Sequence, residues 1–114
     1  MRFLSIYRTS ADRLCAPPTE HHMVEMGQLI ERSTKAGTLL ATGGVLPNPK
    51  IATRVRRSGG KVTVKDGPYT ESKELIAGFA VLEANSPEHA VQLVTEFLDV
   101  AGEGDCELYE LFAG

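Results

Sequence analysis

The chain has 114 residues, of which 42% are hydrophobic and 24% are charged, and its formal net charge is −3. These values are ordinary for a single globular domain covering residues 1–114. No stretch approaches the roughly 18 consecutive apolar residues of a membrane-spanning helix, and the N-terminus leads into a strand pattern rather than an export signal. We therefore expect a soluble, cytoplasmic protein without a membrane partner.

Charge and cysteine content exclude further classes. Residues 1–57 contain nine Lys and Arg against four Asp and Glu, whereas residues 58–114 contain three against eleven. If the two halves interleave in one fold or dimer, these charges neutralise one another, and the Lys/Arg-rich stripe of a DNA-binding domain is missing from the sequence. Cys15 and Cys106 lie far apart, outside any Cys-x-x-Cys spacing. We expect no nucleic-acid partner, disulfide framework or metal site.

The first part of the chain predicts a strand, a helix and a second strand. Residues 2–8 alternate in polarity and are rich in aromatic and β-branched side chains, as in a strand. Thr19 follows two prolines and is a suitable N-cap for a helix that Gly37 ends. Residues 38–46 are mostly apolar, and Gly43-Gly44 permits a bulge or a bend in that strand.

The second part predicts a hairpin followed by a strand, a helix and a last strand. Residues 51–57 and 61–65 flank Ser58-Gly59-Gly60, where two glycines can adopt positive φ angles at low cost. Ser86-Pro87-Glu88 supplies an N-cap, a proline for the first helical position and an acid at the positive end of the helix dipole. The remaining strands are expected at residues 77–84 and 106–112.

This order of elements predicts an α+β fold. Strand, helix, strand, inserted β-hairpin, strand, helix, strand is the split βαβ arrangement called ferredoxin-like, with an antiparallel sheet. Two helices cover only one face of such a sheet, yet residues 77–84 are almost continuously apolar, as in a strand buried on both faces. We expect a second copy to cover the other face in a homodimer that forms a dimeric α/β-barrel.

One motif indicates a family. Asp66-Gly67-Pro68-Tyr69 is followed by Glu71, Lys73-Glu74 and Gly78-Phe79, and this set resembles the DGPF-domain branch of the YCII-related proteins. The resemblance extends to the opening strand, to Ala36-Gly37 and to the Ser86-Pro87 helix start, and so covers most of residues 2–112. Tyr69 stands where the family often has phenylalanine, which adds a hydroxyl group.

The resemblance implies a dimeric α/β-barrel like that of small monooxygenases and muconolactone isomerases. It also implies an activity that is mostly unassigned, with a histidine and an aspartate suspected of lining a cleft. Some relatives accompany extracytoplasmic-function sigma factors, which suggests a regulatory use. A shared fold alone does not decide between these.

Asp66 is the first candidate for chemistry. Alternation along residues 61–66 places it on the same side as Val62 and Val64, whereas the lysines point to the other side. Desolvation on an apolar face raises the pKa of a carboxylate and fits it for general acid or base catalysis. The alternative is a turn cap, in which the side chain only satisfies nearby backbone N–H groups.

The histidines are the second candidates. His21 and His22 lie in the first turn of the first long helix, where the positive end of the helix dipole favours a neutral imidazole that can accept a proton. Either could meet Asp66, but a solvated pair at a helix start explains them as well. Adjacent histidines do not share a helix face, so they are not expected to clamp a metal ion.

Further residues could bind a ligand or only support the fold. Arg54 and Arg56 share one face of a hairpin strand and could bind a carboxylate or phosphate, or lie in solvent. Tyr7 and Tyr69 could offer hydroxyl groups to a pocket or pack as aromatic rings. The remaining candidates are Glu71 and Lys73, which could orient a substrate or form ion pairs.

Two functions therefore stay open. The leading hypothesis is a homodimer that binds an unknown small molecule in a cleft near Asp66, with acid/base catalysis of lyase or isomerase type shared with His21 or His22. The chain shows no phosphate-binding loop, dinucleotide fingerprint or metal-binding helix motif, so we expect no cofactor. The alternative is a noncatalytic regulatory or interaction module, associated with a sigma factor as the resemblance suggests.

Overall fold

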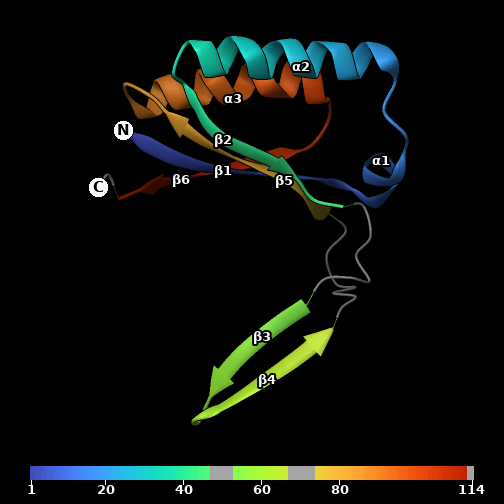
Figure 1. Ribbon diagram of the computed structural model, residues 1–114, viewed down its shortest axis with the longest axis vertical. Coiled ribbons are helices and arrows are strands. Elements are labelled where there is room, and N and C mark those ends of the chain that lie inside the picture. Colours follow the sequence, from blue (N-terminus) through green and yellow to red (C-terminus); the bar gives the residue numbers. More distant parts are fainter. Residues whose placement is uncertain (47–52, 67–73, 113–114) are drawn as a thin grey trace.

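The computed structural model describes residues 1–46, 53–66 and 74–112, and for Cys15, Asp66 and Glu74 it describes the backbone alone. Figure 1 shows a sheet with two long helices on one side and a hairpin on the other. The elements are β1 (Arg2–Ser10), α1 (Ala11–Cys15), α2 (Glu20–Lys35), β2 (Leu39–Gly44), β3 (Thr53–Ser58), β4 (Lys61–Asp66), β5 (Glu74–Glu83), α3 (Pro87–Ala101) and β6 (Asp105–Leu111).

The main sheet confirms the predicted topology. Its four strands are antiparallel in the order β2-β5-β1-β6, and the helices α2 and α3 lie side by side over one face (Figure 1). The central strand β1 pairs with both β5 and β6, which brings the two halves of the chain together. The fold is therefore a ferredoxin-like α+β fold, with β3 and β4 inserted as a separate two-stranded sheet.

Both long helices begin where their capping residues predict. The Thr19 side chain accepts a hydrogen bond from the His22 backbone N–H at 3.1 Å, and Gly37 lies just past the end of α2 with a φ of 78°. At the start of α3 the Ser86 hydroxyl accepts from the His89 N–H at 3.0 Å, while the Asn85 N–H donates to His89 Nδ1 at 2.9 Å. This reciprocal pair confirms the predicted helix start.

Two local features differ from the sequence prediction. The short helix α1 was not expected; it forms because the Ser10 side chain accepts a hydrogen bond from the Arg13 N–H. The irregularity in β2 falls between Leu39 and Ala41 rather than at Gly43-Gly44. The close approach of β2 and β5 explains the glycine at position 78 of β5, because a Cβ there would lie 2.9 Å from the Gly43 carbonyl oxygen.

The buried core lies at the end of the sheet where β1 begins. Phe3, Leu82 and Ala84 of the sheet pack against Ala90 and Val94 of α3. The registers Phe3↔Leu82 and Ser5↔Ala80 show that these alternate residues of β1 and β5 face the helices. The helices are therefore anchored to the sheet at this end.

The opposite face of the sheet is apolar and carries no helix among the described residues (Figure 1). We call it the outer face. Its register pairs are Leu4↔Val81, Ile6↔Phe79 and Leu4↔Tyr109. Phe79 and Tyr109 are 43% and 50% exposed, so large apolar surfaces of this face meet solvent in the single chain.

The hairpin of β3 and β4 projects from the same side as the outer face (Figure 1). Residues 53–65 are all exposed. The pairs Val55↔Val64 and Arg57↔Val62 place the valines on one face of the hairpin, and Arg54↔Lys65 lies on the other. The predicted alternation is thus confirmed, but the apolar face that Asp66 was expected to share is open to solvent in the single chain.

Candidate functional site

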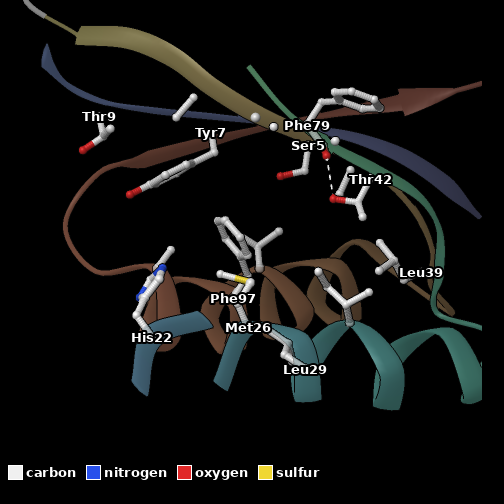
Figure 2. Close-up of a pocket in the computed structure, with 18 of the residues that line it drawn as sticks. Ser5, Tyr7, Thr9, His22, Met26, Leu29, Leu39, Thr42, Phe79 and Phe97 are labelled. Carbon is white, nitrogen blue, oxygen red and sulfur yellow. Dashed lines mark hydrogen bonds between the residues drawn. The ribbon is translucent and has the colours of Figure 1, made fainter. Parts of the chain in front are cut away.

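A cavity of about 820 Å³ lies between the sheet and the helices. Strand β1 provides alternate residues to its wall, and α2 provides residues one helical turn apart. The rest of the wall comes from β2, β5, α3, α1 and the segment between α1 and α2. Figure 2 shows these side chains converging from both layers. The cavity is large enough for a small organic ligand.

Polar groups gather at one end of the cavity. Tyr7 and Thr9 of β1 and His22 of α2 lie together at this end (Figure 2). The Tyr7 hydroxyl donates to the Glu103 carbonyl oxygen at 2.9 Å, and the Thr9 hydroxyl donates to the same oxygen at 3.0 Å. Thr19, the N-cap of α2, also lines the cavity and fixes the first helical turn from which His22 projects. We call these groups the polar end.

The rest of the cavity wall is mainly apolar. Met26 and Leu29 of α2, Leu39 of β2 and Phe97 of α3 line it (Figure 2). The Phe97 and Tyr7 rings meet edge to face, with centroids 5.1 Å apart and an interplanar angle of 82°. This contact holds the Tyr7 ring between the polar end and the apolar wall.

Charged side chains are few around the cavity. None of the described lining residues is an aspartate or a glutamate, and Arg13 is their one arginine. Arg13 donates to the Ala101 carbonyl oxygen at 3.3 Å, at the negative end of the α3 dipole. Over the described ranges, no three His, Cys, Asp or Glu side chains gather in a way that could hold a metal ion.

Cys106 lies beside the cavity wall but packs into the core cluster. Burial raises the pKa of its thiol above the ordinary value of 9.0, a hydrogen bond with Ser5 acts in the opposite direction, and Asp105 raises the pKa further. The thiol is thus held in its neutral form at neutral pH. This is the environment of an unreactive, structural cysteine.

Two of the predicted site residues line the cavity. Tyr7 and His22 both lie at the polar end, as ligand-binding and catalytic roles would require. His21 does not: its side chain is 82% exposed, and its Nε2 lies 2.8 Å from Glu25 Oε1 one turn along the helix. The prediction that adjacent histidines diverge is confirmed, and the structure distinguishes them.

The other predicted site residues lie elsewhere or outside the description. Arg54 and Arg56 are exposed on the hairpin and do not line the cavity. Asp66 ends β4, on the hairpin, and its side chain is outside the described part of the chain. Three further candidates, Tyr69, Glu71 and Lys73, also fall outside the described residues.

Several cavity residues were missed by sequence reasoning. Ser5 shares the face of Tyr7 within the predicted strand of residues 2–8 but was not proposed as a site residue, and Thr9 continues the same alternation beyond the predicted end of that strand. Met26 and Phe97 belong to the apolar faces of α2 and α3, and helical periodicity alone does not distinguish a cavity wall from a packed core. Only the spacing between the helix layer and the sheet turns those faces into a cavity wall.

Comparison with known proteins fits this architecture. The model of the YCII-related domain matches residues 1–110. The chain belongs to the YCII-related family. A similar protein, the uncharacterised protein R00369 of Rhizobium meliloti (strain 1021), is 29% identical over 77 residues, which cover 68% of this chain. The aligned part spans 61% of that protein, which is less than two thirds of its length.

The family match confirms the YCII resemblance, whereas the DGPF branch stays a prediction that rests on its motif. Among the helices that the structure describes in this YCII-related chain, none is long and apolar enough to cross a membrane.

Proposed function

We propose that this YCII-related chain binds a small organic molecule in the cavity between its sheet and helices. The observation that carries the proposal is a cavity of about 820 Å³ with an apolar wall and hydrogen-bonding groups gathered at one end. Such a combination is typical of ligand sites, where apolar surface supplies affinity and a few polar groups fix orientation. The family match supports no particular substrate.

The chemistry that fits these groups is proton transfer without a cofactor. His22 is half-buried and projects toward the cavity from the first turn of α2 (Figure 2). An imidazole at this place can take a proton from a bound molecule or return it, as lyase and isomerase reactions need. The Asp66 partnership that the sequence suggested stays a prediction, because the Asp66 side chain lies outside the described part of the chain and the described side chains of β4 do not line the cavity.

The test is a thermal-shift screen of small metabolites against the wild type and two matched variants. A ligand that binds the native state raises its apparent stability by mass action. We expect ligands to be found whose stabilisation is lost or at least halved in His22→Gln and is retained in His21→Gln. The two positions are adjacent on one helix, yet only His22 lines the cavity.

Equal loss in both variants would instead indicate damage to the start of α2, which circular dichroism would reveal. Stabilisation that is unchanged in His22→Gln would exclude His22 from the site.

The outer face supports a second proposal, which concerns assembly and is compatible with ligand binding and with the alternative of a noncatalytic regulatory or interaction module. We propose that the partner is a second copy of the chain, as in the dimeric barrel expected from the sequence. The apolar outer face and the exposed valines of the hairpin are the surfaces that such a dimer would cover. A sigma factor as partner rests on the family resemblance alone.

A further inference from the structure

The Tyr7 and Thr9 hydroxyl groups at the polar end have a fixed hydrogen-bonding direction. A carbonyl oxygen can only accept, so the Tyr7 and Thr9 hydroxyls must both donate their protons to the Glu103 carbonyl oxygen. What remains on either oxygen is its lone pairs. Toward a molecule in the cavity, these two groups therefore act as acceptors.

The same direction recurs along the cavity wall. The Thr42 hydroxyl donates to the Phe79 carbonyl oxygen at 3.0 Å, and the Thr38 hydroxyl donates to the Ser33 carbonyl oxygen at 3.2 Å. Both threonines line the cavity (Figure 2 shows Thr42). Four lining hydroxyls thus have their protons engaged by the protein's own backbone.

The loop before β6, residues 102–104, fixes this hydrogen-bonding arrangement at the polar end. Gly104 has a φ of 154°, and a Cβ there would lie 2.5 Å from the Tyr7 ring and 2.5 Å from the Arg8 carbonyl oxygen. The backbone of the loop is therefore pressed against β1 in a way that only glycine allows. This contact places the Glu103 carbonyl oxygen within reach of both hydroxyls.

An anionic ligand group is disfavoured beside these two hydroxyls. A carboxylate would place its lone pairs against those of Tyr7 and Thr9, and such a contact leaves buried acceptors unpaired. Arg13 donates one N–H to the Ala101 carbonyl oxygen at the C-terminal end of α3. Its other N–H groups, the Thr19 hydroxyl and the N-terminus of α2 are where an anion would bind instead. Thr9 is 4% exposed whereas Tyr7 is half-buried, so Tyr7 is the residue of the two that a ligand reaches more readily.

We propose that the polar end of the cavity selects a hydroxyl group on a largely apolar molecule. The hydroxyl proton is donated to the Tyr7 or Thr9 oxygen, and the hydroxyl oxygen accepts from an N–H of the His22 imidazole when that nitrogen carries a proton. The hydrocarbon part lies against Met26, Leu29 and Phe97. This inference rests on the proposed ligand-binding function and names the ligand class for it.

The test compares three probes that share one ring system. Naphthol, its methyl ether and the corresponding naphthoate, all substituted at the same ring position, differ in whether they can donate a hydrogen bond and in charge. Binding to the full chain is measured by isothermal titration calorimetry near neutral pH. We expect naphthol to bind about tenfold or more tightly than either other probe, because a tenfold difference in affinity is about what one hydrogen bond between neutral groups contributes.

Two variants assign the preference to the polar end. Tyr7→Phe keeps the ring that packs on Phe97 and Gly104 but removes the acceptor, and Thr9→Val does the same at the second hydroxyl. We expect the preference for naphthol over its ether to shrink severalfold in each variant. Tyr109→Phe on the outer face is the matched control and leaves the preference unchanged. Circular dichroism checks that each variant is folded.

The outcomes separate this inference from the function on which it rests. If the ether or the naphthoate binds as well as naphthol, the cavity binds ligands but the hydroxyl selection is wrong. A preference that persists in folded Tyr7→Phe and Thr9→Val also overturns the selection. If none of the three probes binds, both the selection and the ligand-binding cavity are rejected for molecules of this size.

Discussion

At the scale of single residues, the neighbouring histidines show how helix position sorts side chains. His22 lines the cavity, whereas His21 lies in solvent beside Glu25. They differ by about 100° around the helix, which is enough to separate a site residue from a surface residue. The sequence identified the pair, and only the position of the sheet decided between them.

Cys106 gives a pH-dependent prediction at this scale. Its pKa is raised in the native state by burial, so the unfolded thiol loses its proton at lower pH than the native thiol. In the window that opens near the ordinary pKa of 9.0, the native state binds more protons, and stability falls as pH rises. We expect the free energy of unfolding of the wild type to fall more steeply than that of Cys106→Ala between about pH 8 and about pH 10.

Urea denaturation at several pH values measures both proteins. Lysine and tyrosine titration affects the two alike, so the difference between their pH profiles isolates the thiol. Parallel profiles would show that burial of Cys106 has no energetic consequence.

At the scale of elements, the loop of residues 102–104 determines the shape of the polar end. It carries Gly104 at a positive φ against the Tyr7 ring, and it presents the carbonyl that orients two hydroxyls. Strand and helix propensities do not predict that this loop orients the two hydroxyls. The two glycines of the loop are its sequence signal, and only the packing of the loop on β1 gives them meaning.

We predict that Gly104→Ala lowers the free energy of unfolding by about 1–3 kcal/mol, because the new Cβ meets backbone and ring atoms at a strained φ. Gly27→Ala is the control: nothing lies within 4 Å of a Cβ there, inside α2. That change should raise stability by about 0.5–1 kcal/mol through helix propensity. Urea denaturation measures both, and equal effects would contradict the packing role of the loop.

The hairpin of β3 and β4 is the element that a single chain stabilises least. A two-stranded ribbon is marginally stable in water by itself, and residues 53–65 are exposed throughout. Its valine face matches the apolar outer face in character. We expect packing in the homodimer to stabilise the hairpin.

The corresponding prediction changes the valine face alone. Val55→Thr combined with Val64→Thr keeps β-branched residues in the paired strands but removes apolar contact, so we expect the dimer dissociation constant to rise about tenfold or more. Arg56→Thr, on the opposite face of β3, is the control and should have a smaller effect. Sedimentation equilibrium measures the constants. A dissociation constant that the valine changes leave unaltered would exclude the hairpin from the interface.

At the scale of the whole molecule, the sheet is covered on one face only. The helices α2 and α3 lie on one side, while Phe79, Val81 and Tyr109 of the outer face have no covering element within the described chain. Water contact with a surface of this kind is unfavourable, and a two-fold partner removes it from both copies at once.

We therefore predict that light scattering at micromolar concentration returns twice the mass of one chain. A Phe79→Glu variant should shift the mass toward the monomer, because it places a charge in the apolar interface. His21→Gln serves as a surface control with no effect on mass. A wild type that is monomeric at this concentration would reject the homodimer.

The sequence by itself determined the local elements and their order. The caps Thr19 and Ser86, the glycine turn at Gly59-Gly60 and the alternation of β1 act over a few residues, so they can be read without knowing what packs nearby. The family followed from the same local motifs. The candidate site was predicted less completely: Tyr7 and His22 were found, while Thr9 and the Glu103 carbonyl were not.

Only the tertiary structure decided how these elements produce a cavity. The distance between the helix layer and the sheet and the choice of His22 over His21 depend on how the layers pack. The loop that turns two hydroxyls into acceptors depends on contacts between residues more than 90 positions apart, such as Tyr7 with Glu103. Such contacts arise from the packing of whole layers. No periodicity or capping rule encodes them, which is why the sequence named the fold more fully than the site.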